Sequence, residues 1–113
     1  ERGEGTRLEI RVGDGAANPY VVIAAILAAG LDGIKNRLVA PAPAEGWSYH
    51  DEQYEVLPGS LREALNFLEE DDFIIEALGS QFIKTFVALK RDEIERYLAH
   101  VSDWEIAEYL EDF

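Results

Sequence analysis

The sequence contains no cysteine and few basic residues, and each absence restricts what the protein does. Without thiols there is neither a disulfide framework nor a thiolate metal site, which fits a reducing, cytoplasmic compartment. Only 10 Lys and Arg residues stand against 23 Asp and Glu, which gives a net charge of -13 over 113 residues. Because this acidic excess repels nucleic acid and anionic membranes, neither is expected as a partner.

The sequence also lacks an apolar run long enough to cross a membrane as a helix. The apolar stretch from Tyr20 to Leu31 would span about 18 Å as a helix, against a bilayer core of roughly 30 Å. Methionine is also missing, and the chain opens on Glu1, ahead of which an initiator methionine is not usually removed. We therefore expect residues 1–113 to form a single, incomplete domain of a longer protein. A complete small domain with a processed end is the alternative.

Charged and apolar residues alternate from Arg7 to Val12, which predicts a half-buried β-strand. On such a strand Arg7, Glu9 and Arg11 share one face, while the apolar residues between them face a core. A cation, an anion and a cation in a row suit the binding of phosphate, carboxylate or metal. A plain surface salt-bridge ladder is the other interpretation of the same pattern.

Gly13 and Gly15 predict a sharp turn after this strand, since glycine reaches positive φ without strain. Asn18 is expected to cap a helix, with Pro19 at the first helical position, where its missing N–H costs nothing. The pattern from Asn18 to about Arg37 is helical and apolar nearly all round. Such a helix is predicted to lie buried in the core or between subunits.

The rest of the chain is predicted to be helical after one irregular loop over residues 39–58, where prolines and a glycine interrupt the pattern. Amphipathic helical segments follow, with predicted starts at Ser60, Asp71 or Asp72, Ser80 and Ser102. Glu63 and Glu105 each follow a serine by three residues, which predicts two capping boxes. The expected fold class is therefore α+β and predominantly helical: a short N-terminal strand, a buried helix and three to four amphipathic helices.

The segment that begins at Ser80 is the longest, and its apolar stripe is expected to pack in the core: Phe82, Ile83, Phe86, Val87, Ile94, Tyr97, Leu98 and Val101. Trp104 and Leu110 are the expected anchors of the last helix. Trp47, Tyr49 and Tyr54 of the loop either pack back onto the domain or dock against another subunit.

Other candidates for chemistry have a plainer explanation. His50 and His100 are isolated in the sequence, and solvated or helix-terminal roles are expected for both. The acidic run from Glu69 to Asp72 matches no ordered loop of metal ligands, so a solvated helix junction is expected there.

Several stretches together closely resemble the C-terminal catalytic region of the glutamine synthetase family, in its bacterial type I-like form. They are Arg7–Tyr20, Ile23–Ile34, Leu57–Leu61 with Glu63–Leu65, and Asp103–Glu105 with Tyr109–Leu110. The resemblance covers most of the chain, with the glycines, the Asn-Pro pair and the charges in step. It implies that residues 1–113 are the C-terminal portion of a glutamine synthetase-like catalytic domain.

The resemblance also implies roles for the charged strand. Glu9 corresponds to a carboxylate that holds a divalent ion, Mg²⁺ or Mn²⁺, and Arg7 to a contact with the ATP phosphates. Arg11 corresponds to the catalytic and substrate-binding guanidinium that meets the substrate carboxylate or the developing γ-glutamyl phosphate. Phosphoryl transfer to a carboxylate brings several negative charges together, which metal ions and arginines neutralise.

The implied function is that of an ATP-dependent glutamate–ammonia ligase acting in nitrogen metabolism, within a ring-shaped homo-oligomer. The isolated chain is expected to be inactive, since most of the family's metal ligands and nucleotide pocket lie upstream. Val12-Gly13-Asp14-Gly15 differs from the family's usual Phe-Pro-Asp-Pro and is similar to relatives that ligate glutamate to amines or polyamines, so the nitrogen donor stays open. A non-catalytic, acidic helical interaction module is the alternative from another class.

Overall fold

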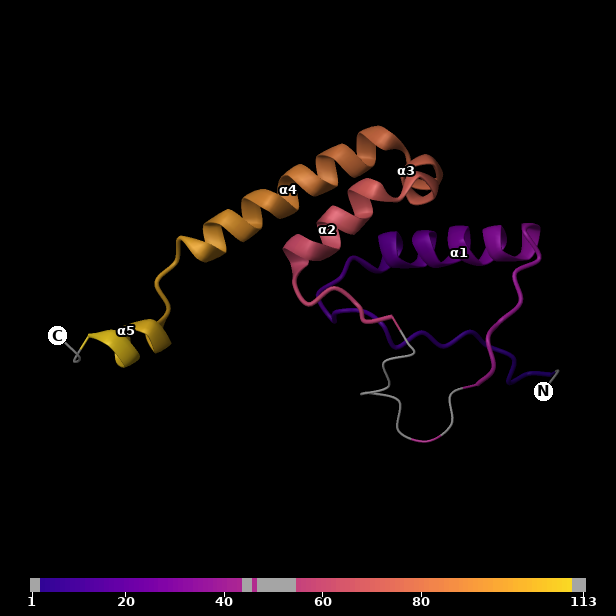
Figure 1. Ribbon diagram of the computed structural model, residues 1–113, viewed down its shortest axis with the longest axis horizontal. Helices are drawn as coiled ribbons and strands as arrows, with labels where there is room; N and C mark the ends of the chain where they lie inside the picture. Colours follow the sequence, from indigo (N-terminus) through magenta and orange to yellow (C-terminus); the bar gives the residue numbers. More distant parts are fainter. Residues whose placement is uncertain (1–2, 44–45, 47–54, 111–113) are drawn as a thin grey trace.

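The computed structural model describes residues 3–43, 46 and 55–110, and these form five α-helices and no β-strand (Figure 1). The helices are α1 (Pro19–Lys35), α2 (Leu61–Glu70), α3 (Asp72–Leu78), α4 (Ser80–Leu98) and α5 (Asp103–Tyr109). The predominantly helical character and the four segments after the loop were predicted correctly. The described parts of the loop, residues 39–43, 46 and 55–58, contain neither helix nor strand, as expected, whereas Trp47, Tyr49, His50 and Tyr54 lie outside the described residues.

The strand predicted over Arg7–Val12 is not formed. A strand is completed by ladder hydrogen bonds to a neighbour, and no other segment among the described residues offers an extended partner. The alternation of side chains survives because it depends only on an extended backbone. The prediction was therefore wrong about the hydrogen-bonded element.

Helix α1 begins and ends with hydrogen-bonded caps. The Asn18 side chain accepts the N–H of Tyr20 at 3.0 Å, and Pro19 is the first helical residue, which confirms the predicted N-cap. After the helix, Leu38 N–H donates to the Gly33 carbonyl at 2.9 Å. A second bond from Arg37 to Ile34, at 3.1 Å, makes this end a Schellman motif.

The later helices are capped almost as predicted. Ser102 accepts the N–H of Glu105, and the Glu105 carboxylate accepts the N–H of Ser102, so the second capping box is confirmed. At α2 only half of the box forms, because the Glu63 carboxylate accepts the N–H of Gly59 instead of Ser60. Asp71, and not Asp72, caps α3 by accepting the N–H of Ile74 at 3.0 Å.

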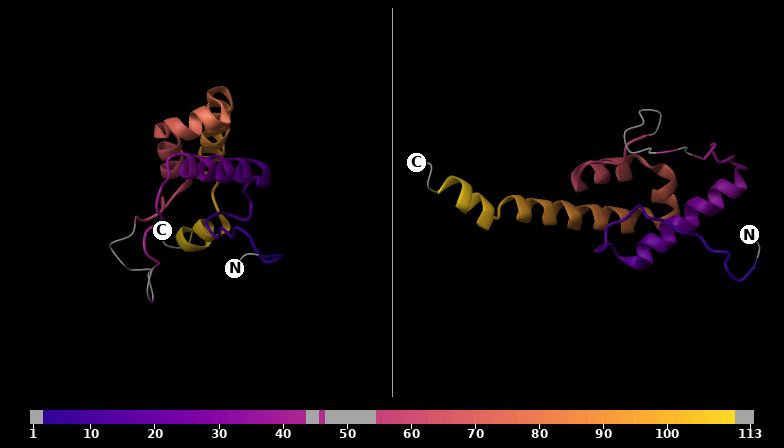
Figure 2. Two further views of the ribbon diagram at one scale, coloured as in Figure 1. Left: turned by 90° about the vertical axis from the view of Figure 1, so that its right-hand side faces the viewer. Right: turned by 90° about the horizontal axis from the view of Figure 1, so that it is seen from below.

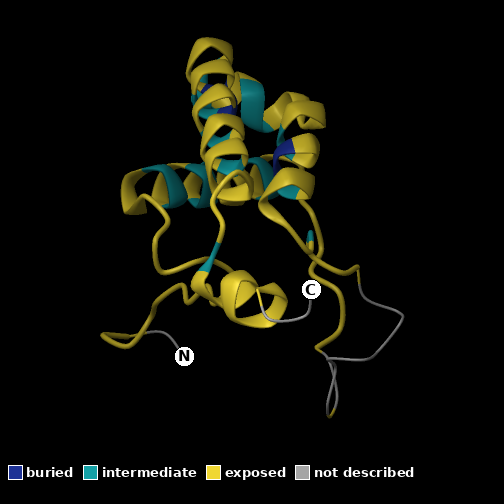
Figure 3. Ribbon diagram, turned by 90° about the vertical axis from the view of Figure 1, so that its left-hand side faces the viewer, coloured by how far each residue is buried: buried dark blue, intermediate teal, exposed yellow. Residues whose placement is uncertain are grey.

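The small core lies where α2, α3 and α4 meet (Figure 3). Its buried members are Leu65 of α2 and Ile83 and Val87 of α4. Partly buried side chains surround them, namely Leu68, Ile74, Ile75, Leu78, Phe86 and Ile94. Arg91 of α4 binds both Glu69 and Asn66 of α2, so polar contacts also join these two helices.

Helix α1 is not buried in a core, contrary to the first of its two predicted placements, while burial between subunits stays a prediction. It packs on α3, but no residue of the helix is fully covered, and Tyr20 and Ile34 stay more than three-quarters exposed. A helix that is apolar nearly all round requires cover on several sides. The described part of the chain supplies that cover on one side only.

The later part of α4 and helix α5 extend from the body of the molecule in two views (Figures 1 and 2). Four residues of the stripe that was predicted to pack in the core are instead exposed: Phe82 in the first turn of α4, Tyr97 and Leu98 in its last turn, and Val101 beyond it. Trp104 stacks edge-on against Tyr109, and both Trp104 and Leu110 are mostly exposed, so neither anchors α5 in a core. The radius of gyration is 19.0 Å, well above the roughly 13 Å of a compact domain of this size.

Candidate functional site

The extended segment from Arg7 to Val12 brings its three charged side chains together on one side. Glu9 lies between the two arginines: its Oε1 accepts from Arg11 Nε at 2.8 Å, and its Oε2 is 3.7 Å from Arg7 Nε. The Glu9 side chain is half exposed and both guanidiniums are more open still. The result is an exposed cluster of two cations and one anion on six residues of backbone.

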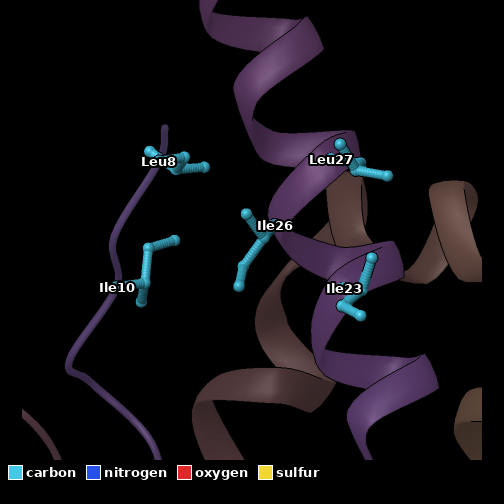
Figure 4. Close-up of a pocket in the computed structure, with 5 residues that line it drawn as sticks. All are labelled: Leu8, Ile10, Ile23, Ile26 and Leu27. Carbon is cyan, nitrogen blue, oxygen red and sulfur yellow. The ribbon is translucent and has the colours of Figure 1, made fainter. Parts of the chain in front are cut away.

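Two apolar side chains of the same segment, Leu8 and Ile10, face α1 (Figure 4). Leu8 and Ile26 point toward each other across a hollow of about 310 Å³, which Ile10, Ile23 and Leu27 also line. Contact is incomplete, since Leu8 remains 74% exposed. The apolar face therefore orients the charged face outward but is itself only partly covered.

A second hollow, of about 360 Å³, lies beside the charged face and is lined by Gly5, Thr6, Arg7 and Glu9. The chain bends just before it, where Thr6 N–H donates to the Gly3 carbonyl at 3.0 Å and Gly3 N–H donates to Thr6 Oγ1 at 3.2 Å. Gly5 and Thr6 were not predicted as site residues. The short run Gly3-Glu4-Gly5-Thr6 was the signal available for this turn.

The turn between the charged segment and α1 is also hydrogen-bonded. The Asp14 carboxylate accepts the N–H of Ala16 at 2.7 Å, and the Asp14 carbonyl accepts the N–H of Ala17 at 3.0 Å. Directly afterwards Asn18 caps α1. Local hydrogen bonds at Asp14 and at Asn18 thus order the connection between the charged segment and α1.

The described residues do not by themselves complete a site for Mg²⁺ or Mn²⁺. Glu9 offers one carboxylate, and nowhere in the described ranges do three His, Cys, Asp or Glu side chains converge. Hard divalent cations take six or more oxygen ligands, so Glu9 would be one contributor among several. Its ion pairs with Arg7 and Arg11 would also have to rearrange.

The remaining candidates have structural roles, as the sequence analysis expected. Within the acidic run, Glu69 pairs with Arg91 and Asp71 caps α3. His100 is exposed at the end of α4. Hydrogen bonds from Ser102, together with the nearby charge of His100, lower the pKa of Glu105 below its usual 4.5.

None of the described helices combines the length and the apolar character that a membrane crossing requires.

Comparison with known proteins extends over nearly the whole chain. The family described as "Glutamine synthetase, catalytic domain" matches residues 1–109. The glutamine synthetase of Thermotoga maritima is 44% identical over 96% of this chain, and the glutamate–methylamine ligase of Methyloversatilis universalis is 43% identical over 99%. The chain spans about a quarter of the length of these relatives, 26% and 27%. Among solved structures, apo GmaS without ligand superimposes with a TM-score of 0.77 and 37% identity, over 90% of this chain and 25% of that one.

Proposed function

Because this chain belongs to the glutamine synthetase catalytic-domain family, we propose that it is the C-terminal part of an ATP-dependent ligase that joins glutamate to ammonia. The reaction proceeds through a γ-glutamyl phosphate, which ammonia then attacks. One observation carries the proposal: the family match includes Arg7, Glu9 and Arg11, whose side chains form one exposed cluster. Since the chain spans about a quarter of its relatives' length, the whole activity belongs to a longer protein.

Each charged residue has a role in this proposal. Arg11 binds the glutamate carboxylate or the acyl phosphate, because a planar guanidinium meets such groups through two parallel hydrogen bonds and stays charged. Arg7 contacts the ATP phosphates. Glu9 orients both guanidiniums through its ion pairs, and one of its oxygens would hold a divalent cation once those ion pairs rearrange.

The cation would be Mg²⁺ or Mn²⁺, the hard ions that carboxylate oxygens suit. When bound, it supplies the neutralisation of negative charge that phosphoryl transfer to a carboxylate requires. Its other ligands come from the part of the ligase outside this chain. The residues of this chain bind and orient the reacting groups around it.

A γ-glutamyl-amine ligase is the second candidate, favoured by the near-equal identity of 43% to glutamate–methylamine ligase. Val12-Gly13-Asp14-Gly15 supports the same candidate. The full-length enzyme with ATP and glutamate separates the two when phosphate release is measured with ammonia and with methylamine. Faster turnover with ammonia supports the synthetase, and faster turnover with methylamine supports the amine ligase. No glutamate-dependent phosphate release with ammonia, methylamine or a polyamine would refute both candidates and favour a non-catalytic interaction module.

The exposed apolar surfaces of this chain are part of the proposal, because they indicate how it is packed in the full ligase. The exposed face of α1 and the hollow between Leu8 and Ile26 are apolar surfaces that the full ligase covers. In that setting the segment Arg7–Val12 joins an antiparallel sheet, within a cytoplasmic, ring-shaped homo-oligomer. The isolated chain has no synthetase activity and no tight ATP site. Glutamine formation by residues 1–113 alone would contradict this.

A further inference from the structure

Both oxygens of the Glu9 carboxylate face guanidinium groups. Oε1 lies 2.8 Å from Nε and 2.7 Å from Nη2 of Arg11, so one edge of that guanidinium converges on a single oxygen. Oε2 lies 3.7 Å from Arg7 Nε. These contacts depend on the alternation of an extended backbone, which places the three side chains on one face. A strand of an antiparallel sheet keeps the same alternation, so the pairing is compatible with the sheet proposed for the full ligase.

The same groups have other partners in the proposed function, on which this inference rests. There Glu9 would hold a divalent cation, and Arg11 binds the carboxylate of glutamate. An arginine binds a carboxylate best through two parallel N–H groups, and Glu9 occupies the Nε–Nη2 edge of Arg11 that offers such a pair. A cation at Glu9 would meet the like charge of both guanidiniums. Each ligand therefore competes with one half of the ion pair.

We propose that the Glu9–Arg11 ion pair couples the binding of glutamate to the binding of the divalent cation. Arg11 gains a free edge for glutamate when Glu9 exchanges it for the cation, and Glu9 is released when Arg11 exchanges it for glutamate. Each ligand then strengthens the binding of the other by the same factor, as linkage requires. The side chains are 50% and 87% exposed, and an ion pair as exposed as this shifts an equilibrium by at most about fivefold. The expected mutual gain in affinity is therefore about two- to fivefold.

Calorimetric titration of glutamate into the full-length enzyme, without ATP, tests this coupling in buffer with a chelator and in buffer with Mg²⁺. Glu9→Gln keeps the shape of the side chain but removes its charge, which releases Arg11. Without metal this variant should bind glutamate about two- to fivefold more tightly than wild type, although its turnover should fall. Mg²⁺ should raise glutamate affinity by a smaller factor in Glu9→Gln than in wild type. The matched control is Asp92→Asn, which removes another exposed carboxylate–arginine pair, 2.8 Å from Arg96 Nε, and should behave as wild type.

Titration of Mg²⁺ without glutamate gives the reciprocal measurement, which also serves if Glu9→Gln does not fold. Arg11→Gln leaves the Glu9 carboxylate free and should bind Mg²⁺ about two- to fivefold more tightly than wild type. An unchanged Mg²⁺ affinity in Arg11→Gln would overturn the inference. So would metal-free glutamate binding by Glu9→Gln that is no tighter than wild type, or an equal effect of Mg²⁺ on both proteins. If Arg11→Gln binds glutamate as tightly as wild type, the proposed function of Arg11 fails instead.

Discussion

Replacing Glu9 by Gln should separate activity from stability in the full-length enzyme. The Glu9–Arg11 pair has N–O distances of 2.7–2.8 Å, but the Glu9 side chain is 50% exposed and that of Arg11 is 87% exposed. Exposed pairs of this kind contribute about 0.2–1 kcal/mol to stability, so the unfolding free energy should fall by less than about 1 kcal/mol. In the proposed function this carboxylate orients two guanidiniums and would supply an oxygen to a cation, so its loss should affect the transition state far more. Turnover should fall at least about a hundredfold, or about 2.7 kcal/mol.

The chain contains a matched control for this experiment. Glu93 forms an ion pair of 2.7 Å with Lys90 on α4, and its side chain is 46% exposed. Glu93→Gln should therefore change stability as little as Glu9→Gln and leave turnover unchanged. Kinetics of ATP cleavage and urea unfolding are measured on both variants. Equal turnover of the two variants would refute the assignment of Glu9.

Three further changes test the architecture in the 1–113 chain. Leu65→Ala should lower the unfolding free energy by about 2–5 kcal/mol, because the Leu65 side chain is only 2% exposed. Leu89→Ala should lower it by less than about 1 kcal/mol, because Leu89 is 60% exposed. Urea unfolding followed by circular dichroism measures both free energies. Arg37→Gly should stabilise the chain by about 0.5–1 kcal/mol, because Arg37 has a φ of 55° at a position that favours glycine; a lower thermal midpoint would contradict this. Because the pKa of Glu105 is lowered, the contribution of this residue to stability is present above pH 4.5 and is lost as the pH falls through the lowered value. Amide hydrogen exchange in α5 should therefore become faster over that pH range. Ser102→Ala should remove this pH dependence.

Local features of the fold could be predicted because their causes lie within a few residues. The caps at Asn18, Asp71 and Ser102 form where the sequence places an acceptor three residues or fewer before the N–H it satisfies. The grouping of Arg7, Glu9 and Arg11 follows from the period of an extended backbone alone. These predictions needed no knowledge of the rest of the protein.

Features that require a partner could not be predicted from the pattern. A strand at Arg7–Val12 needs a neighbouring strand, and a buried α1 needs cover on more than one side; the described chain provides neither. The stripe on α4 is buried only where α2 and α3 reach it, at Ile83 and Val87, and is exposed beyond their ends at Tyr97. Apolar patterning shows which face would be buried, but not whether this chain contains the surface that buries it.

The most direct test of the account is trapping of the acyl phosphate. The full-length enzyme, given ATP, glutamate and hydroxylamine without ammonia, should form γ-glutamyl hydroxamate, and Arg11→Gln should reduce its rate at least about a hundredfold. Hydroxamate formed by Arg11→Gln at the wild-type rate would contradict the claim that this charged segment serves a γ-glutamyl ligase.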